Sequence, residues 1–258
     1  MVSAASFDFA GASAIVTGGT RGIGRVVAAR FAACGAQVAV CGRNRPDDLP
    51  DGIRFHAADV RDPDAASAFV DAVAADFGRL DIVINNAGGS PEVAAESASP
   101  RFSEAIVKLN LLAPLYMSQA AHRHMAHRHA GQGGNIVNIA SLSGTRPSPG
   151  TAAYGAAKAG LINLTRTLAQ EWGADGIRVN AIVAGLLATE TTEVTYGDDA
   201  AQARVAASVP LGRLGNGDDI AAAALWLASD DAAWVSGAAL NVDGGGERPP
   251  FLDLVKGN

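Results

Sequence analysis

Cysteine and lysine are both scarce in this sequence. Its 258 residues include two cysteines, Cys34 and Cys41, and three lysines, at positions 108, 158 and 256. Two cysteines are too few for a disulfide scaffold, and neither has metal-ligand partners at the usual spacing. We therefore interpret both cysteines as reduced structural residues and predict no metal site.

Positive charge is in deficit as well. The formal net charge is −6 and the isoelectric point is about 5.3, which leaves no basic face for nucleic acid or anionic lipid. Residues 1–11 lack the positive and apolar regions of a secretory signal, and no uncharged apolar run reaches the length of a membrane span. We expect a cytoplasmic protein whose partner is a small molecule, and neither nucleic acid nor membrane.

The order of apolar and alanine-rich segments along the chain indicates an α/β fold. Short apolar runs alternate with longer alanine-rich amphipathic stretches, which is typical of βα repetition around a parallel sheet. The length fits one domain, 1–258, and Asp62 followed by Pro63 predicts a helix start. The expected strands are 12–18, 36–42, 53–59, 80–88, 135–141, 177–185 and 238–244. The expected helices are 22–34, 64–77, 102–129, 152–173 and 217–228.

A glycine-rich turn from Gly18 to Gly24 follows the first expected strand and opens into a helix at Arg25. Glycines let the backbone approach a pyrophosphate, which the free N–H groups of a helix N-terminus stabilise. The spacing is G-x-x-x-G-x-G, not G-x-G-x-x-G. A close-packed βα turn would also explain the glycines, but the order of strand, turn and helix favours a dinucleotide site.

The end of the second expected strand bears on the choice of cofactor. An acid there would accept from the ribose hydroxyls, but this chain has Gly42 followed by Arg43. Arg43, together with Arg21 in the glycine turn, can pair with a 2′-phosphate, which favours NADP(H). Alternatively, Arg43 is a solvated loop charge. The later acids at positions 47, 48 and 51 leave NAD(H) open.

A proton-transfer group is predicted from Ser141, Tyr154 and Lys158. One helical turn separates Tyr154 from Lys158, so the ammonium can lie near the phenol and favour its phenolate. Ser141 can then bond the substrate oxygen, and Asn110 can anchor a water chain from Lys158. Taken singly, these residues also fit a core ring, a strand-end cap and a surface lysine.

The composition argues against an incidental Lys158. Of the 20 basic residues three are lysine, which leaves 17 arginines, so a surface cation in this chain is normally arginine. Lysine is the compact charge with the tunable pKa that a proton relay needs.

Five motifs in order resemble the short-chain dehydrogenase/reductase family across nearly the whole chain, up to the 242–245 segment. They are Thr17-Gly18-x-x-x-Gly22-Ile23-Gly24, Asn85-Asn86-Ala87-Gly88, Asn110, Ser141 and Tyr154-x-x-x-Lys158. The resemblance implies a doubly wound, Rossmann-type, seven-stranded parallel sheet flanked by helices. It also implies a homotetramer assembled through the helices at 102–129 and 152–173.

The resemblance assigns roles to these residues. Tyr154 would be the acid/base, Lys158 would bind the nicotinamide ribose and lower the tyrosine pKa, and Ser141 would orient the substrate. Asp59 and Val60 would flank the adenine. The remaining cofactor-binding residues would be Gly18, Thr20, Arg21, Gly22, Ile23, Gly24, Arg43, Asn85, Ala87, Gly88, Gly185, Leu187 and Thr189. Ala184 stands where the family usually has proline, which loosens the turn that clamps the nicotinamide.

Two segments carry weaker signals. The histidines between His122 and His129 have no i, i+4 pair and no carboxylate companion, so we expect no metal there. The tail from Glu247 to Phe251 either packs over a neighbouring subunit's substrate pocket or is a frayed terminus.

We therefore expect an NADP(H)-preferring oxidoreductase that interconverts a carbonyl and an alcohol, mainly as a ketone reductase. The alternatives are an NAD-linked alcohol or hydroxysteroid-type dehydrogenase and, in another class, a non-catalytic dinucleotide-binding regulator. The least regular stretch, 186–216, is a candidate substrate lid. It contains apolar residues that suit ketones, sterols and acyl thioesters alike: Leu186, Leu187, Val194, Tyr196 and Val209.

Overall fold

A seven-stranded parallel sheet forms the centre of the molecule, in the order β3-β2-β1-β4-β5-β6-β7. The computed structural model describes residues 7–126, 133–190 and 192–247. All seven expected strands are confirmed, with ends that differ by a few residues. They are β1 (Ser13–Thr17), β2 (Gln37–Gly42), β3 (Ile53–Ala57), β4 (Ile82–Asn85), β5 (Asn135–Ser141), β6 (Arg178–Ala184) and β7 (Ala239–Val242).

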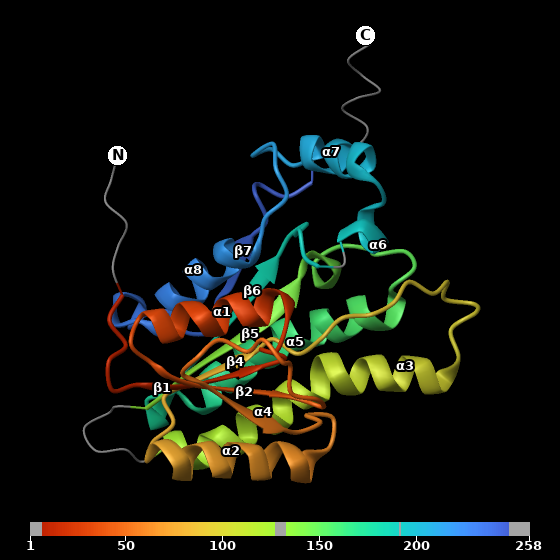
Figure 1. Cartoon of the computed structure of the whole chain (residues 1–258). Helices are drawn as coiled ribbons and strands as arrows, with labels where there is room; N and C mark the ends of the chain where they lie inside the picture. The colour runs from red at the N-terminus through yellow and green to blue at the C-terminus, as the bar shows by residue number, and fades with distance from the viewer. Residues whose placement is uncertain (1–6, 127–132, 191, 248–258) are drawn as a thin grey trace, which may run out of the picture.

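Helices cover both faces of the sheet, so the doubly wound Rossmann-type prediction is confirmed. Helices α1 (Gly22–Ala33) and α8 (Gly217–Ala228) pack together on one face, and α2 (Pro63–Phe77), α4 (Ala113–Met125) and α5 (Ala152–Glu171) lie on the other (Figure 1). Helix α2 begins as predicted, because the Asp62 carboxylate accepts from the backbone N–H groups of Asp64 and Ala65. The whole forms a single domain.

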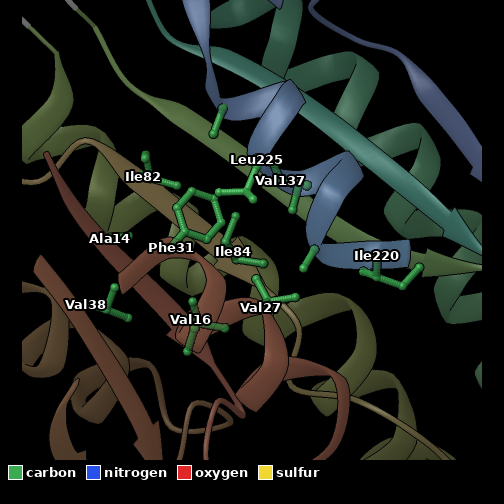
Figure 2. Close-up of a cluster of buried hydrophobic side chains, with 14 of the residues drawn as sticks. Ala14, Val16, Val27, Phe31, Val38, Ile82, Ile84, Val137, Ile220 and Leu225 are labelled. Atoms are coloured by element: carbon green, nitrogen blue, oxygen red, sulfur yellow. The ribbon is translucent and has the colours of Figure 1, made fainter. Parts of the chain in front are cut away.

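The core consists of two layers because successive strand residues point to opposite faces. On the first face, Ala14 and Val16 of β1 join a cluster with α1 and α8. Figure 2 shows Phe31 of α1 among these side chains, close to Leu225 of α8. Ile15, between the two β1 residues, belongs to the opposite layer with α2 and α4. The five inner strands β2, β1, β4, β5 and β6 are buried on both faces over most of their length, which explains their near-continuous apolar sequences, whereas the edge strands β3 and β7 are partly exposed.

The helix expected over 102–129 is divided into α3 (Pro100–Val107), a π-helical turn η1 (Lys108–Leu112) and α4, which ends at Met125. The Asn110 side chain causes the break. Its Nδ2 donates to the carbonyl oxygen of Ile106 at 2.9 Å, one turn earlier, and so competes for the acceptor of a regular helical bond.

The stretch 186–216 is more regular than expected. It contains α6 (Thr192–Tyr196) and α7 (Asp199–Ser208), which lie beyond the sheet at the top of Figure 1. An Asp198 side chain that accepts from Ala201 N caps α7. Within the ranges that the structure describes, no helix is both long and apolar enough to cross a membrane.

The order of the strands changes direction between β1 and β4. From β1 the chain proceeds outward to β2 and β3, and the later strands build from β4 in the other direction. In open parallel sheets, ligands bind at such a reversal of strand order, beyond the carboxyl ends of the strands. The glycine turn after β1 and the Asn85–Gly88 segment after β4 both lie at this edge.

Candidate active site

The glycine turn after β1 packs directly against the segment that follows β4. Gly18 has a φ of +64°, and a Cβ there would lie 3.0 Å from the Cα of Ala87. At Gly24 a Cβ would lie 2.3 Å from Nδ2 of Asn86. The Thr17 hydroxyl ties the two segments together, because it accepts from the backbone N–H groups of Asn86 and Ala87, each at 2.9 Å. Positions 18 and 24 therefore require glycine, because any side chain there would overlap the segment after β4.

The N-terminus of α1 has the properties of an anion site. Arg21, its N-cap residue, makes no side-chain capping bond, and the first turn holds no acidic residue. Gly22 has a φ of +54°, and a Cβ there would meet no atom within 4 Å. The Gly22 N–H donates to a carboxylate oxygen of Glu190 at 3.1 Å. The first amide of α1 thus holds a carboxylate, and a helix N-terminus of this kind would also suit the pyrophosphate of a dinucleotide.

Two arginines follow the ends of β2 and β3: Arg43, which was predicted, and Arg61, which sequence reasoning missed. Arg43 is exposed just beyond β2, and its charge helps to lower the pKa of Asp59. The larger cause of that lowering is Arg61, whose Nε lies 2.9 Å from a carboxylate oxygen of Asp59. Val60, between them, is buried. Of the later acids that could bind a ribose, Asp48 is paired with Arg25 at 2.6 Å.

Thr20 and Gly42 bring the glycine turn against the end of β2. A Cβ on Gly42 would lie 3.1 Å from Cγ2 of Thr20. Position 42 therefore lacks a carboxylate at a point where Thr20 packs so closely that a side chain would disturb the contact.

Lys158 is almost fully buried, with 3% of its surface exposed. Its Nζ donates to the backbone carbonyl oxygen of Ile139 in β5 at 2.7 Å and lies 5.6 Å from the centroid of the Tyr154 ring. Burial lowers its pKa to about 8, because a low-dielectric interior disfavours the ammonium. The surface-lysine alternative is therefore wrong.

The structure also brings together Tyr154, near the start of α5, and Ser141, at the end of β5. Burial raises the pKa of Tyr154, a hydrogen bond with Ser141 opposes that shift, and the nearby Tyr196 adds to it. The sequence predicted a lowered tyrosine pKa from Lys158. Lys158 is not among the causes of this shift, in which burial is the largest, so the role that the resemblance assigns to Lys158 stays a prediction.

Asn110 fixes the loop after β4. Its Oδ1 accepts from the Gly89 N–H at 2.9 Å, and its Nδ2 donates to the Gly89 carbonyl oxygen at 3.0 Å. Gly88 lies between the two functional side chains. A Cβ at this position would be 2.7 Å from Oδ1 of Asn110 and 3.2 Å from Nζ of Lys158. The glycine therefore leaves the space in which Asn110 and Lys158 approach each other.

Asn85, predicted to bind the cofactor, directs its side chain into the interior. Its Nδ2 lies 2.8 Å from Oδ1 of Asn138 in β5 and 3.1 Å from the Ser118 hydroxyl of α4. Asn138 in turn donates to the Thr165 hydroxyl of α5 at 2.9 Å. Sequence reasoning missed this network, which holds β4 and β5 against the helices that carry the site.

The predicted nicotinamide clamp follows β6. Gly185 is required by packing, since a Cβ there would lie 2.5 Å from the Cα of Asp243. Leu187 forms a β-bridge with Gly215, next to the bond from Ala188 N to the Gly215 carbonyl oxygen at 2.8 Å. These backbone bonds fix the segment in which Ala184 stands in place of proline.

Tyr196 is a site neighbour whose role sequence reasoning missed. It belongs to α6, and its hydroxyl forms a hydrogen bond with the backbone of Leu187. Burial is the largest cause that raises its pKa, and the carboxylate of Glu247 adds to the effect. Glu247 is itself paired with Arg146 of the β5–α5 connection. The sequence grouped Tyr196 with the apolar lid residues, and this grouping assigned no role to its hydroxyl.

The structure describes two histidines of the run, His122 and His124. His122 and His124 do have carboxylate companions, contrary to expectation, because Asp175 and Asp71 lie 2.9 and 2.6 Å away, each 53 positions distant in sequence. Among residues 7–126, 133–190 and 192–247, no group of three potential ligands could hold a metal. The predictions for residues 127–129 and 248–251 lie outside the described residues.

The fold and site define a dinucleotide-binding oxidoreductase, and comparison with known proteins gives its family. The model of a family described as enoyl-(acyl carrier protein) reductase matches residues 18–247. A probable 2,4-dienoyl-CoA reductase of Bacillus subtilis is 38% identical over 248 residues, which cover 92% of this chain and 97% of that protein. The 3-oxoacyl-(acyl-carrier-protein) reductase of Escherichia coli is 36% identical over 244 residues, 92% of this chain and 98% of that protein.

A crystal structure from Sinorhizobium meliloti, assigned as a short-chain alcohol dehydrogenase, matches with a TM-score of 0.86 and 38% identity, over 93% of this chain and 98% of that one. The chain belongs to the short-chain dehydrogenase/reductase family. It is accordingly an NAD(P)-dependent oxidoreductase.

Proposed function

We propose that this protein is an NADP(H)-preferring ketone reductase in which Tyr154 transfers the proton. The observation that carries the proposal is the convergence of Tyr154, Ser141 and the buried Lys158 at the carboxyl edge of the sheet. Asn110 lies beside them, and the anion site at Gly22 opens at the same edge. A non-catalytic regulator has no physical need for this set.

Each side chain has a role in the proposed reaction. A bound nicotinamide supplies or accepts the hydride. Ser141 orients the carbonyl oxygen, and Tyr154 donates its phenolic proton to that oxygen as charge develops on it. Lys158 binds the nicotinamide ribose and balances the charge on Tyr154, while Asn110 anchors the water chain that returns a proton to Lys158.

Reduction is the favoured direction. The raised pKa of Tyr154 keeps its phenol protonated at neutral pH, which is the form that donates to a ketone oxygen. Alcohol oxidation instead requires a phenolate as base. The name of the Escherichia coli relative, a 3-oxoacyl reductase, describes a ketone reduction, whereas the name of the Bacillus relative describes a dienoyl reduction. A proton donor next to a serine hydroxyl fits the first chemistry better, because a carbonyl oxygen accepts both bonds.

Three features support the NADP(H) preference. Gly42 provides no carboxylate to repel a 2′-phosphate, and Arg43, the next residue, and Arg21 of the glycine turn are both exposed. Asp48, one candidate for a ribose-binding acid, is already paired with Arg25. The alternative is an NAD-linked alcohol or hydroxysteroid-type dehydrogenase, which would need Asp47 or Asp51 to reach the ribose.

We also infer a substrate lid at 186–216, built on α6 and α7. Tyr196 of α6 lies near Tyr154, so the lid already reaches the reacting group. Leu186, Leu187 and Val209 line a cavity of about 280 Å³ beside the clamp, while Val194 is 89% exposed. A homotetramer formed through α4 and α5, in the cytoplasm, completes the proposal, and light scattering would test the assembly.

A panel of ketones, 3-oxoacyl thioesters and enoyl thioesters, run with NADPH and with NADH, tests the function. We expect oxidation of NADPH, followed at 340 nm, with at least one ketone and faster than with NADH. Turnover confined to the enoyl substrates would contradict ketone reduction. Tight dinucleotide binding without turnover of any substrate would favour the regulator.

A further inference from the structure

Glu190 makes a contact that the proposed chemistry does not use. Its carboxylate accepts from the Gly22 N–H at 3.1 Å, although the two residues are 168 positions apart. Gly22 is the first residue of α1, and Glu190 belongs to the connection that leads from the nicotinamide clamp to α6. A lid residue therefore caps the helix whose N-terminus is the dinucleotide anion site.

The sequence around α1 explains why a distant carboxylate binds there. Arg21 provides no side-chain cap, and the first turn has no acid. The positive end of the helix dipole and an unpaired amide would otherwise face solvent. Glu190 satisfies the amide from an exposed position, where a carboxylate keeps most of its hydration and is displaced at low cost.

A pyrophosphate bound at α1 and the Glu190 carboxylate would compete. Both are anions that seek the same N–H group, and two like charges at hydrogen-bonding distance from one amide repel each other strongly. The open space around the Gly22 Cα lets either anion approach. Occupation by the dinucleotide would therefore require Glu190 to leave.

The bonds on either side of Glu190 define which part of the lid would move. Before it, residues 186–188 are fastened to Gly215 by a β-bridge and by backbone bonds of 2.8 and 3.0 Å. After it, the Thr192 hydroxyl accepts from the Thr189 N–H at 2.5 Å. Displacement of Glu190 would thus leave residues 186–188 in place and free the connection from its contact with α1.

We propose that Glu190 is an internal competitor of the cofactor pyrophosphate, which weakens dinucleotide binding and couples it to release of the lid from α1. The inference rests on the proposed dinucleotide-dependent function. It assigns to Glu190 a role in setting cofactor affinity and not in proton transfer. Because the pyrophosphate is common to both cofactors, Glu190 affects NADPH and NADH equally, unlike Arg43.

Cofactor titration of Glu190→Gln and Glu190→Ala tests the competition, with Glu193→Gln as the matched control. Glu193 is an exposed acid of the same lid, in α6. We expect both Glu190 variants to bind NADPH and NADH about two- to fivefold more tightly than wild type, the size of a charge effect at a helix terminus. Glu193→Gln should bind like wild type. Unchanged or weaker binding in both Glu190 variants would overturn the proposal.

Hydrogen exchange of peptides that span residues 17–30, measured without dinucleotide, tests the contact itself. Glu190→Ala should speed exchange at the start of α1, and Glu193→Gln should not. Equal exchange in all three proteins would overturn the inference. Failure of wild type and every variant to bind either dinucleotide would overturn the proposed function instead, and the competition with it.

Discussion

The buried ammonium of Lys158 donates a hydrogen bond to the backbone carbonyl oxygen of Ile139, at 2.7 Å. The bond ties the end of a helix side chain to the strand that ends in Ser141. It satisfies one of the three donors of the ammonium but supplies no negative charge, and burial holds the pKa of Lys158 at about 8.

This burial predicts how stability depends on pH. The unfolded chain binds a proton at Lys158 up to a pKa near 10.4, and the folded chain only up to about 8. The unfolded state therefore holds more protons than the folded state between these two pKa values, so the free energy of unfolding should rise with pH across that window. The same gain is lost as pH falls back through the window to the folded pKa of about 8. From pH 8 to pH 10, the gain of wild type relative to Lys158→Met should be about 2 kcal/mol.

Denaturant unfolding at pH 7, 8, 9 and 10 measures this difference, with Lys108→Met as control, because Lys108 is exposed on η1. The control should follow wild type. Parallel curves for wild type and Lys158→Met would mean that the ammonium is solvated in the folded state.

Removal of the Tyr154 hydroxyl should abolish turnover. Tyr154→Phe retains the ring but not the proton donor, and general acid catalysis contributes about 10²- to 10⁴-fold to a rate. We expect kcat to fall by at least about 100-fold, while NADPH binding stays within about threefold of wild type. Tyr116→Phe, which alters a partly buried ring of α4, should leave kcat unchanged. Retained turnover in Tyr154→Phe would show that another group supplies the proton.

The sequence predicts the sheet and most helices because apolar runs and capping residues act locally. Asp62 is an example, since its partners are the next few N–H groups. Long-range contacts leave no such signal. The Glu190 carboxylate at Gly22 is such a contact, because the two residues are 168 positions apart and meet only when the loops fold over the edge of the sheet. Spacing along a helix likewise reveals the cation near Tyr154 but not the burial that raises the pKa of its phenol.

Gly88 is predicted to be essential for the approach of Asn110 and Lys158. In Gly88→Ala the new methyl group would lie 2.7 Å from Oδ1 of Asn110, so the relay must open. We expect a loss of about 1–3 kcal/mol in unfolding free energy, as for other overpacked sites, and a fall in kcat that exceeds the change in NADPH affinity. Gly173→Ala, where a Cβ would meet no atom within 4 Å, is the matched control. Wild-type kcat in Gly88→Ala would argue against a relay through this contact.

Arg43 should determine the choice between the two cofactors. A guanidinium that pairs with a 2′-phosphate contributes about 1.5–3 kcal/mol, which corresponds to a loss of roughly 10- to 100-fold in NADPH affinity on Arg43→Ala. NADH lacks the phosphate, so its affinity should change little. The exposed Arg45, two residues further along the loop, provides the control, because Arg45→Ala removes the same charge without the predicted contact. A similar loss in both variants would indicate a general effect of loop charge, and unchanged NADPH affinity in Arg43→Ala would favour the NAD-linked alternative. Only a loss specific to NADPH and to Arg43 supports phosphate recognition at the end of β2.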